Sequence, residues 1–92
     1  MNTPKFTLGS LVATPAALEA LARAGQSPAE FLDRHAAGDW GEVSKGDWKL
    51  NDAAVKAGER LLSAYVTLKG ERIWIITEAD RSSTCILLPD EY

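Results

Sequence analysis

The sequence is poor in cysteine, histidine and long apolar runs, and each shortage excludes a class of protein. Its 92 residues include one cysteine, Cys85, so a small fold held together by internal disulfides is excluded. A single histidine, His35, leaves no histidine cluster that would bind a metal ion. The longest apolar run, 85–88, is far shorter than the roughly 20 residues of a membrane helix. We therefore expect no metal, no cofactor and no membrane partner.

The sequence also lacks a large excess of positive or negative charge. The chain has 10 basic and 13 acidic residues, a formal net charge of −3, and no run of five like charges. Proteins that bind DNA or RNA nonspecifically present a basic stripe to the phosphates, so a protein partner is favoured over nucleic acid. The first five residues carry one positive charge with no apolar segment after them, unlike a signal peptide. The sequence thus predicts a cytoplasmic location.

What the chain does contain is the composition of one globular domain. Hydrophobic residues make up 46% and charged residues 25%, near the average for soluble domains, and residues 1–92 leave no room for a second domain. A strand is predicted at 6–13. Helix starts follow at Thr14-Pro15, at the capping-box pair Ser27 and Glu30, and after Ser44. The three predicted helices end at Gly25, Gly38 and Gly58.

From Arg60 onward the apolar period changes to two, which is typical of strands. Residues 60–67, 72–78 and 84–88 are predicted as three strands, since they are rich in β-branched and aromatic residues. Short turns between them predict a three-stranded antiparallel meander. An N-terminal strand and three short helices followed by this meander place the chain in the α+β class.

The two faces of the meander depend on the turn at Lys69-Gly70. If these two residues form the turn, Val66 pairs with Ile73. One face then carries Tyr65, Trp74, Ile76, Leu87 and Cys85. Both faces are apolar, whereas a sheet with one wet face alternates apolar and polar residues. Because three short helices cover one face only, the other face needs either the N-terminal strand and loop or a second copy of the protein. We expect the second copy, in a symmetric homodimer through the face with Tyr65, Trp74, Ile76 and Leu87.

Two segments are candidates for a binding surface. The first is the loop with Asp39 and Trp40, where flanking glycines let the backbone turn around a bulky aromatic. The second, between two strands, is polar and includes Arg81, Ser82, Ser83 and Thr84. We expect the two segments to flank one functional surface, with Trp40 supplying apolar area and Arg81 a directional charge.

Structural interpretations of the same residues stay open. Trp40 would plug the edge of the core while Asp39 caps a turn, and Arg81 would pair with a neighbouring carboxylate. Alternatively, Arg81 and the hydroxyls beside it would hold a phosphate. His35 is interpreted as a helix-end histidine rather than an acid–base group, and Cys85 as a buried, inert thiol.

Nearly the whole chain carries an ordered set of motifs. They are Gly38-Asp39-Trp40-Gly41, Asn51, the segment 60–65, the segment 74–82, Leu87-Leu88-Pro89 and Glu91-Tyr92. This set resembles a family of small bacterial proteins labelled plasmid-related or hypothetical. The resemblance implies a bacterial, cytoplasmic protein from a plasmid, prophage or other mobile element, and it implies no activity or catalytic residue.

The sequence favours a non-enzymatic binding or accessory protein, because no constellation of paired titratable groups is found. The alternative rests on layout alone, since helices followed by a meander are similar to ribonuclease toxins of the barnase and colicin type. In that case His35 would be the acid–base group. Phosphate would be bound by Arg60, Arg72 or Arg81, with Tyr65 or Thr84 donating a hydroxyl.

Overall fold

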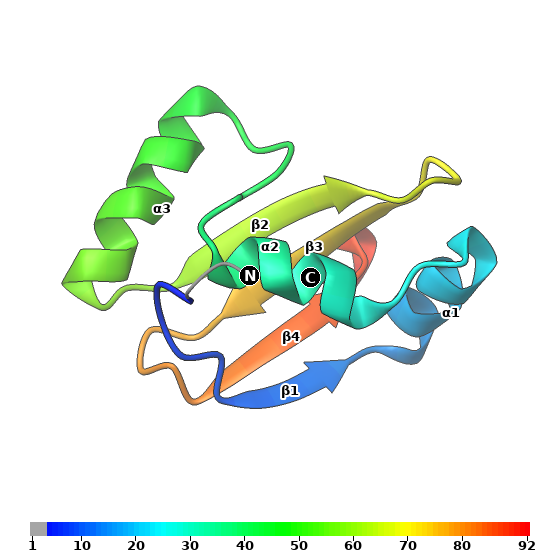
Figure 1. Cartoon of the computed structure of the whole chain (residues 1–92), viewed down its shortest axis with the longest axis horizontal. Coiled ribbons are helices and arrows are strands. Elements are labelled where there is room, and N and C mark those ends of the chain that lie inside the picture. Colours follow the sequence, from blue (N-terminus) through cyan, green and yellow to red (C-terminus); the bar gives the residue numbers. More distant parts are fainter. Residues whose placement is uncertain (1–3) are drawn as a thin grey trace.

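The computed structural model describes residues 4–92 and shows three helices, a mixed four-stranded sheet and a short C-terminal 3-10 helix (Figure 1). In chain order the elements are β1 (Ser10–Ala13), α1 (Pro15–Ala24), α2 (Pro28–Ala36), α3 (Lys45–Ala57), β2 (Leu61–Val66), β3 (Arg72–Thr77), β4 (Ser83–Leu87) and η1 (Pro89–Glu91). The strand order is β1-β4-β3-β2. The α+β class is confirmed, but the meander is not the whole sheet, because β1 joins it in parallel to β4.

The helices begin and end at the predicted capping residues. The Thr14 side chain accepts a hydrogen bond from the Ala17 amide at 3.1 Å, and Ser44 caps α3 in the same way. Gly25 ends α1 in the left-handed conformation. Only half of the predicted capping box forms at α2, since Ser27 accepts from the Glu30 amide while the Glu30 carboxylate binds the Gln26 side chain instead.

The predicted register of the first hairpin is wrong by one residue. Tyr65 lies opposite Ile73, and Thr67 bonds to Glu71 across a three-residue turn that ends at Gly70. Gly70 has a φ of 82°, as expected for a type I turn closed by a left-handed residue. A shift of one residue moves every side chain of a strand to the other face. Tyr65 therefore belongs to the face opposite to that of Trp74.

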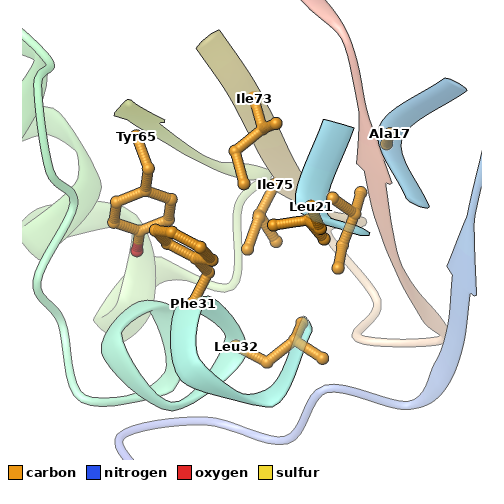
Figure 2. Close-up of a cluster of buried hydrophobic side chains, with 8 residues drawn as sticks. Ala17, Leu21, Phe31, Leu32, Tyr65, Ile73 and Ile75 are labelled. Atoms are coloured by element: carbon orange, nitrogen blue, oxygen red, sulfur yellow. The ribbon is translucent and has the colours of Figure 1, made fainter. Parts of the chain in front are cut away.

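Helices α1 and α2 cover one face of the sheet and form the main core with it (Figure 2). The buried side chains are Ala17, Leu21, Phe31, Leu32, Tyr65, Ile73, Ile75 and Ile86. The rings of Phe31 and Tyr65 lie 5.3 Å apart, and the Tyr65 hydroxyl donates to the Asp39 carbonyl at 2.6 Å. We call this face of the sheet the covered face.

The opposite face of the sheet, here the open face, lies away from α1 and α2, and the short helix η1 contacts β3 on this side. Its middle is nevertheless closed by its own side chains, since Ile76 is 4% and Leu87 8% exposed. Tyr92, beyond the 3-10 helix, packs edge-on against Trp74 with ring centres 5.6 Å apart. The expected dimer face is therefore corrected, because Tyr65 is on the covered face and two of the other three residues offer little surface.

Among residues 4–92, no helix has the length and apolar character needed to cross a membrane.

Candidate functional site

Trp40 is an interior residue, so its predicted role as a surface anchor is wrong. Its side chain is completely buried, and its indole N–H donates to Asp52 of α3 at 2.9 Å. The Phe6 ring stacks on it at 6.1 Å between centres. Phe6 lies outside β1, although the sequence placed it in the first strand.

Asp39 holds the turn that delivers Trp40 to the interior. One carboxylate oxygen accepts from the Arg34 Nε at 2.8 Å and the other from the Gly41 amide at 3.1 Å. Burial opposes ionisation, but these two hydrogen bonds outweigh it and lower the pKa of the Asp39 carboxyl. Asp39 thus takes the turn-capping role that was the structural alternative.

Arg81 is bonded to the protein's own backbone rather than presented to a ligand. Its guanidinium donates to the carbonyls of Ala54 at 3.1 Å and Glu59 at 2.6 Å, at the C-terminal end of α3. It also lies over the Phe6 ring, 5.5 Å from the centre. A cation is favourable at a helix C-terminus because the last carbonyls carry partial negative charge. The predicted role in ligand recognition is therefore corrected to a structural one.

Thr84 is also buried, and it belongs to a chain of polar side chains that crosses the sheet. His35 Nδ1 lies 2.5 Å from Ser63 Oγ, and Nε2 lies 2.9 Å from Thr77 Oγ1. Thr77 Oγ1 lies 2.7 Å from Thr84 Oγ1, whose hydroxyl donates to the Leu8 carbonyl at 2.7 Å. All four side chains are fully buried on the covered face.

The bond from the Thr84 hydroxyl to the Leu8 carbonyl fixes the hydrogen positions in this row of buried polar side chains. Because Thr84 gives its hydrogen to a carbonyl, Thr77 must donate to Thr84, and Thr77 can then only accept from His35. His35 therefore carries its hydrogen on Nε2 and accepts from Ser63 at Nδ1. Burial, with Arg81 as a second cause, lowers the pKa of His35 to about 4. With a neutral imidazole, each donor in this row of side chains has an acceptor.

The remaining polar candidates stay near the surface. The Ser82 amide donates to Asp80 Oδ1 at 2.9 Å, which makes an Asx-type turn, and Ser83 begins β4. Cys85 is partly exposed on the open face, and burial raises the pKa of its thiol. The loop with Trp40 and the segment 81–84 are connected inside the protein. Phe6 contacts both Trp40 and Arg81. His35 contacts Trp40 and is linked to Thr84 through Thr77.

The edges of the sheet differ in how they are covered. At β2, the Gly41 segment runs alongside the strand, with bonds from the Ala64 amide to Trp40 and from the Glu42 amide to Ala64. A Cβ on Gly41 would overlap the Ala64 carbonyl, so this close approach requires glycine. The Asn51 side chain also donates to the Leu62 carbonyl and accepts from its amide.

The edge at β1 has no such cover from the residues that the structure describes. In Figure 1 no helix or strand runs along the outer side of β1, which lies at the margin of the molecule. Leu11 is 57% and Val12 51% exposed. A shallow groove of about 380 Å³ adjoins this edge on the covered side, and its lining includes Phe6, Leu8, Leu11 and Asp33. Sequence reasoning missed this site, although the uncharged stretch 6–18 marked it.

No family model, curated protein or solved structure matches the chain. The resemblance to plasmid-related bacterial proteins therefore stays a prediction. Within residues 4–92, no three histidine, cysteine, aspartate or glutamate side chains are grouped in a way that would hold a metal ion.

Proposed function

We propose that this protein is a non-enzymatic binding or accessory protein that associates with another protein chain by strand addition at β1. The observation that carries the proposal is the bare outer edge of β1. A strand at a sheet edge presents unpaired N–H and C=O groups that can pair with a further strand. Such pairing supplies affinity through the backbone, while side-chain pockets beside the strand supply specificity.

The surroundings of β1 support binding at this edge. Natural proteins protect free edges with charged residues, prolines or bulges, yet the stretch 6–18 contains no charged residue. Leu11 and Val12 expose more than half of their surface. The groove lined by Phe6, Leu8 and Leu11 would accept an apolar side chain from an added strand.

The homodimer remains part of the proposal, but at a different surface. The sheet face chosen from the sequence is mostly closed by its own packing, whereas β1 exposes both apolar side chains and backbone groups. A plasmid or mobile-element setting and a cytoplasmic location also remain proposals, supported by the motif resemblance and the absence of internal disulfides.

The ribonuclease alternative is less well supported by the geometry. A general acid or base must reach the proton it transfers within hydrogen-bond distance or through one water. His35 is fully buried with both ring nitrogens bonded to protein hydroxyls, and Tyr65 and Thr84 are buried too. Arg81 is occupied by backbone carbonyls.

The proposal is tested with a displayed library of random extended peptides selected against the immobilised protein. We expect selected peptides to bind the wild type and to lose binding when Ala13→Pro removes a backbone donor from the outer edge of β1. Leu50→Lys, on the exposed side of α3, is the matched control and should leave binding unchanged. If no selected peptide depends on β1, the proposal is wrong.

A second measurement addresses the enzymatic alternative. Purified protein incubated with total RNA should leave the RNA intact. Cleavage that disappears in His35→Gln, with the fold retained, would contradict the non-enzymatic function.

A further inference from the structure

Within residues 4–92, the backbone of β1 has a defined set of hydrogen-bonding groups without a partner. The Ser10 amide donates to the Ser82 carbonyl at 3.0 Å and the Thr14 amide to the Ile86 carbonyl at 2.9 Å, so both point toward β4. Successive residues of a strand direct these groups to opposite sides, and in a parallel pair alternate residues bond to the partner. Leu11 and Ala13 therefore direct one donor and one acceptor each away from the sheet.

These four free groups are self-complementary. In an antiparallel pair, two residues directly opposite each other can exchange both N–H···O bonds. If a two-fold axis passes beside Val12, Leu11 lies opposite the partner's Ala13, and Ala13 lies opposite the partner's Leu11. All four free groups of each copy are then used, in four hydrogen bonds across the interface.

We infer that the strand which adds to β1 is β1 of a second copy, in antiparallel orientation about a two-fold axis at Val12. This inference rests on the proposed function, since it names the occupant of the same edge. It joins two four-stranded sheets into one eight-stranded sheet. A two-fold interface uses the same patch on both subunits, and β1 provides such a patch.

Side chains and charge agree with this arrangement. Val12 would contact the partner's Val12 on the open face, where the side chains of such a central pair come close. Leu11 would lie beside the partner's Ala13 on the covered side. Because no charged residue occurs in 6–18, two copies with the same net charge can approach here without direct repulsion.

The length of the shared edge sets the strength of the dimer. Gly9 bends the chain at one end of β1 with a φ of 67°, and α1 begins at Pro15 after the other end. The shared ladder is therefore as short as β1 itself, and its area is small compared with obligate dimers. We expect a reversible dimer that forms at about micromolar concentration.

A cross-linking experiment tests the geometry. In a Cys85→Ser background, Val12→Cys should form an intermolecular disulfide with oxidised glutathione, because Cα atoms of this kind of pair lie about 4.5 Å apart. Val66→Cys in the same background is the control, since Val66 is a half-exposed valine on the open face of β2. We expect Val12→Cys to cross-link at least ten times faster than Val66→Cys. Equal rates would overturn the inference.

Sedimentation of the full chain tests the same contact without cysteine. The wild type should shift from monomer to dimer with concentration, and Leu11→Lys and Ala13→Pro should each weaken the dimer at least tenfold. A wild type that stays monomeric overturns the inference. The outcome is separate from that of the peptide selection, because peptides that bind β1 of a monomeric protein would leave strand addition at β1 standing and would exclude the homodimer alone.

Discussion

Strands β2 and β1 form the two edges of the same sheet, and within residues 4–92 only the edge at β2 is covered by other segments. Along β2, the Trp40–Glu42 stretch and the Asn51 side chain bond to Ala64 and Leu62. Along β1, the outer groups of Leu11 and Ala13 face solvent. The difference shows that a sheet edge is closed by particular side chains and glycines brought to it from elsewhere in the chain, and that an edge without them is available to another chain.

The cover of β2 is anchored by Trp40, whose removal should have the largest effect. Trp40→Ala should lower the free energy of unfolding by about 3–5 kcal/mol, since it leaves a cavity beside Phe6 and loses the bond to Asp52. Urea unfolding followed by circular dichroism measures this. Leu50→Ala, at an exposed position of α3, should change stability by less than about 0.5 kcal/mol. A small effect of Trp40→Ala would mean that β2 needs no cover.

The buried polar chain runs from β2 through β3 and β4 to Leu8, just before β1, and it should make stability depend on pH. The pKa of His35 falls from 6.5 to about 4 on folding. Below pH 6.5 the unfolded chain binds a proton that the native protein does not, so stability should fall as pH decreases from 6.5 to 4. The loss should be on the order of 3 kcal/mol.

Unfolding curves at several pH values measure this dependence. His35→Gln, which lacks the titrating ring, should show a flatter dependence between pH 6.5 and 4.5, where most carboxyl groups are still ionised. An equal slope in both proteins would show that His35 does not stay neutral in the fold.

The second part of the β2 cover is Asn51, with an intermediate expected effect. Asn51→Ala leaves the amide and carbonyl of Leu62 without their partners, which should cost about 1–3 kcal/mol of unfolding free energy. Lys49→Ala, on the exposed side of the same helix, is the matched control. Faster amide exchange at Leu62 in Asn51→Ala alone would locate the effect at the edge, and unchanged exchange would contradict it.

The uncovered edge should be the most tolerant region for stability. Leu11→Lys places a charge on an exposed side chain and should change the unfolding free energy of the monomer by less than about 0.5 kcal/mol. Thermal melts at a concentration well below that of any dimer measure this. A large loss would mean that β1 is part of the monomer's core rather than a binding edge.

Local features of the fold could be predicted because their causes lie within a few residues. Thr14 and Ser44 act as helix caps through bonds to the third residue ahead, and Gly25 and Gly58 end helices by adopting the left-handed conformation. The alternation of apolar residues after Arg60 likewise marks the strands. These interactions need no distant partner, so the sequence pattern is sufficient to find them.

The site was predicted less well because burial is a property of the whole fold. Trp40 and Arg81 were chosen for residue types that are frequent in interfaces, yet Trp40 fills the space between Phe6 and α3, and Arg81 caps α3 from a turn far along the chain. No local signal distinguishes an aromatic loop residue that faces solvent from one that closes a core. The uncharged stretch 6–18 was visible in the sequence, but its meaning depended on knowing that β1 is an edge.

Capping and periodicity are local, so the α+β class, the number of helices and their ends, and the three C-terminal strands could all be inferred from the amino-acid sequence. The assembled fold was needed to show that Gly70 closes a three-residue turn, which puts Tyr65 on the covered face. It also decided that β1 pairs in parallel with β4, and that β2 is covered while β1 is free. The pairing of β1 and the cover of β2 depend on contacts between residues far apart in the chain, such as Leu8 and Thr84, which are 76 positions apart. No short-range pattern specifies which of the many possible distant pairs will form.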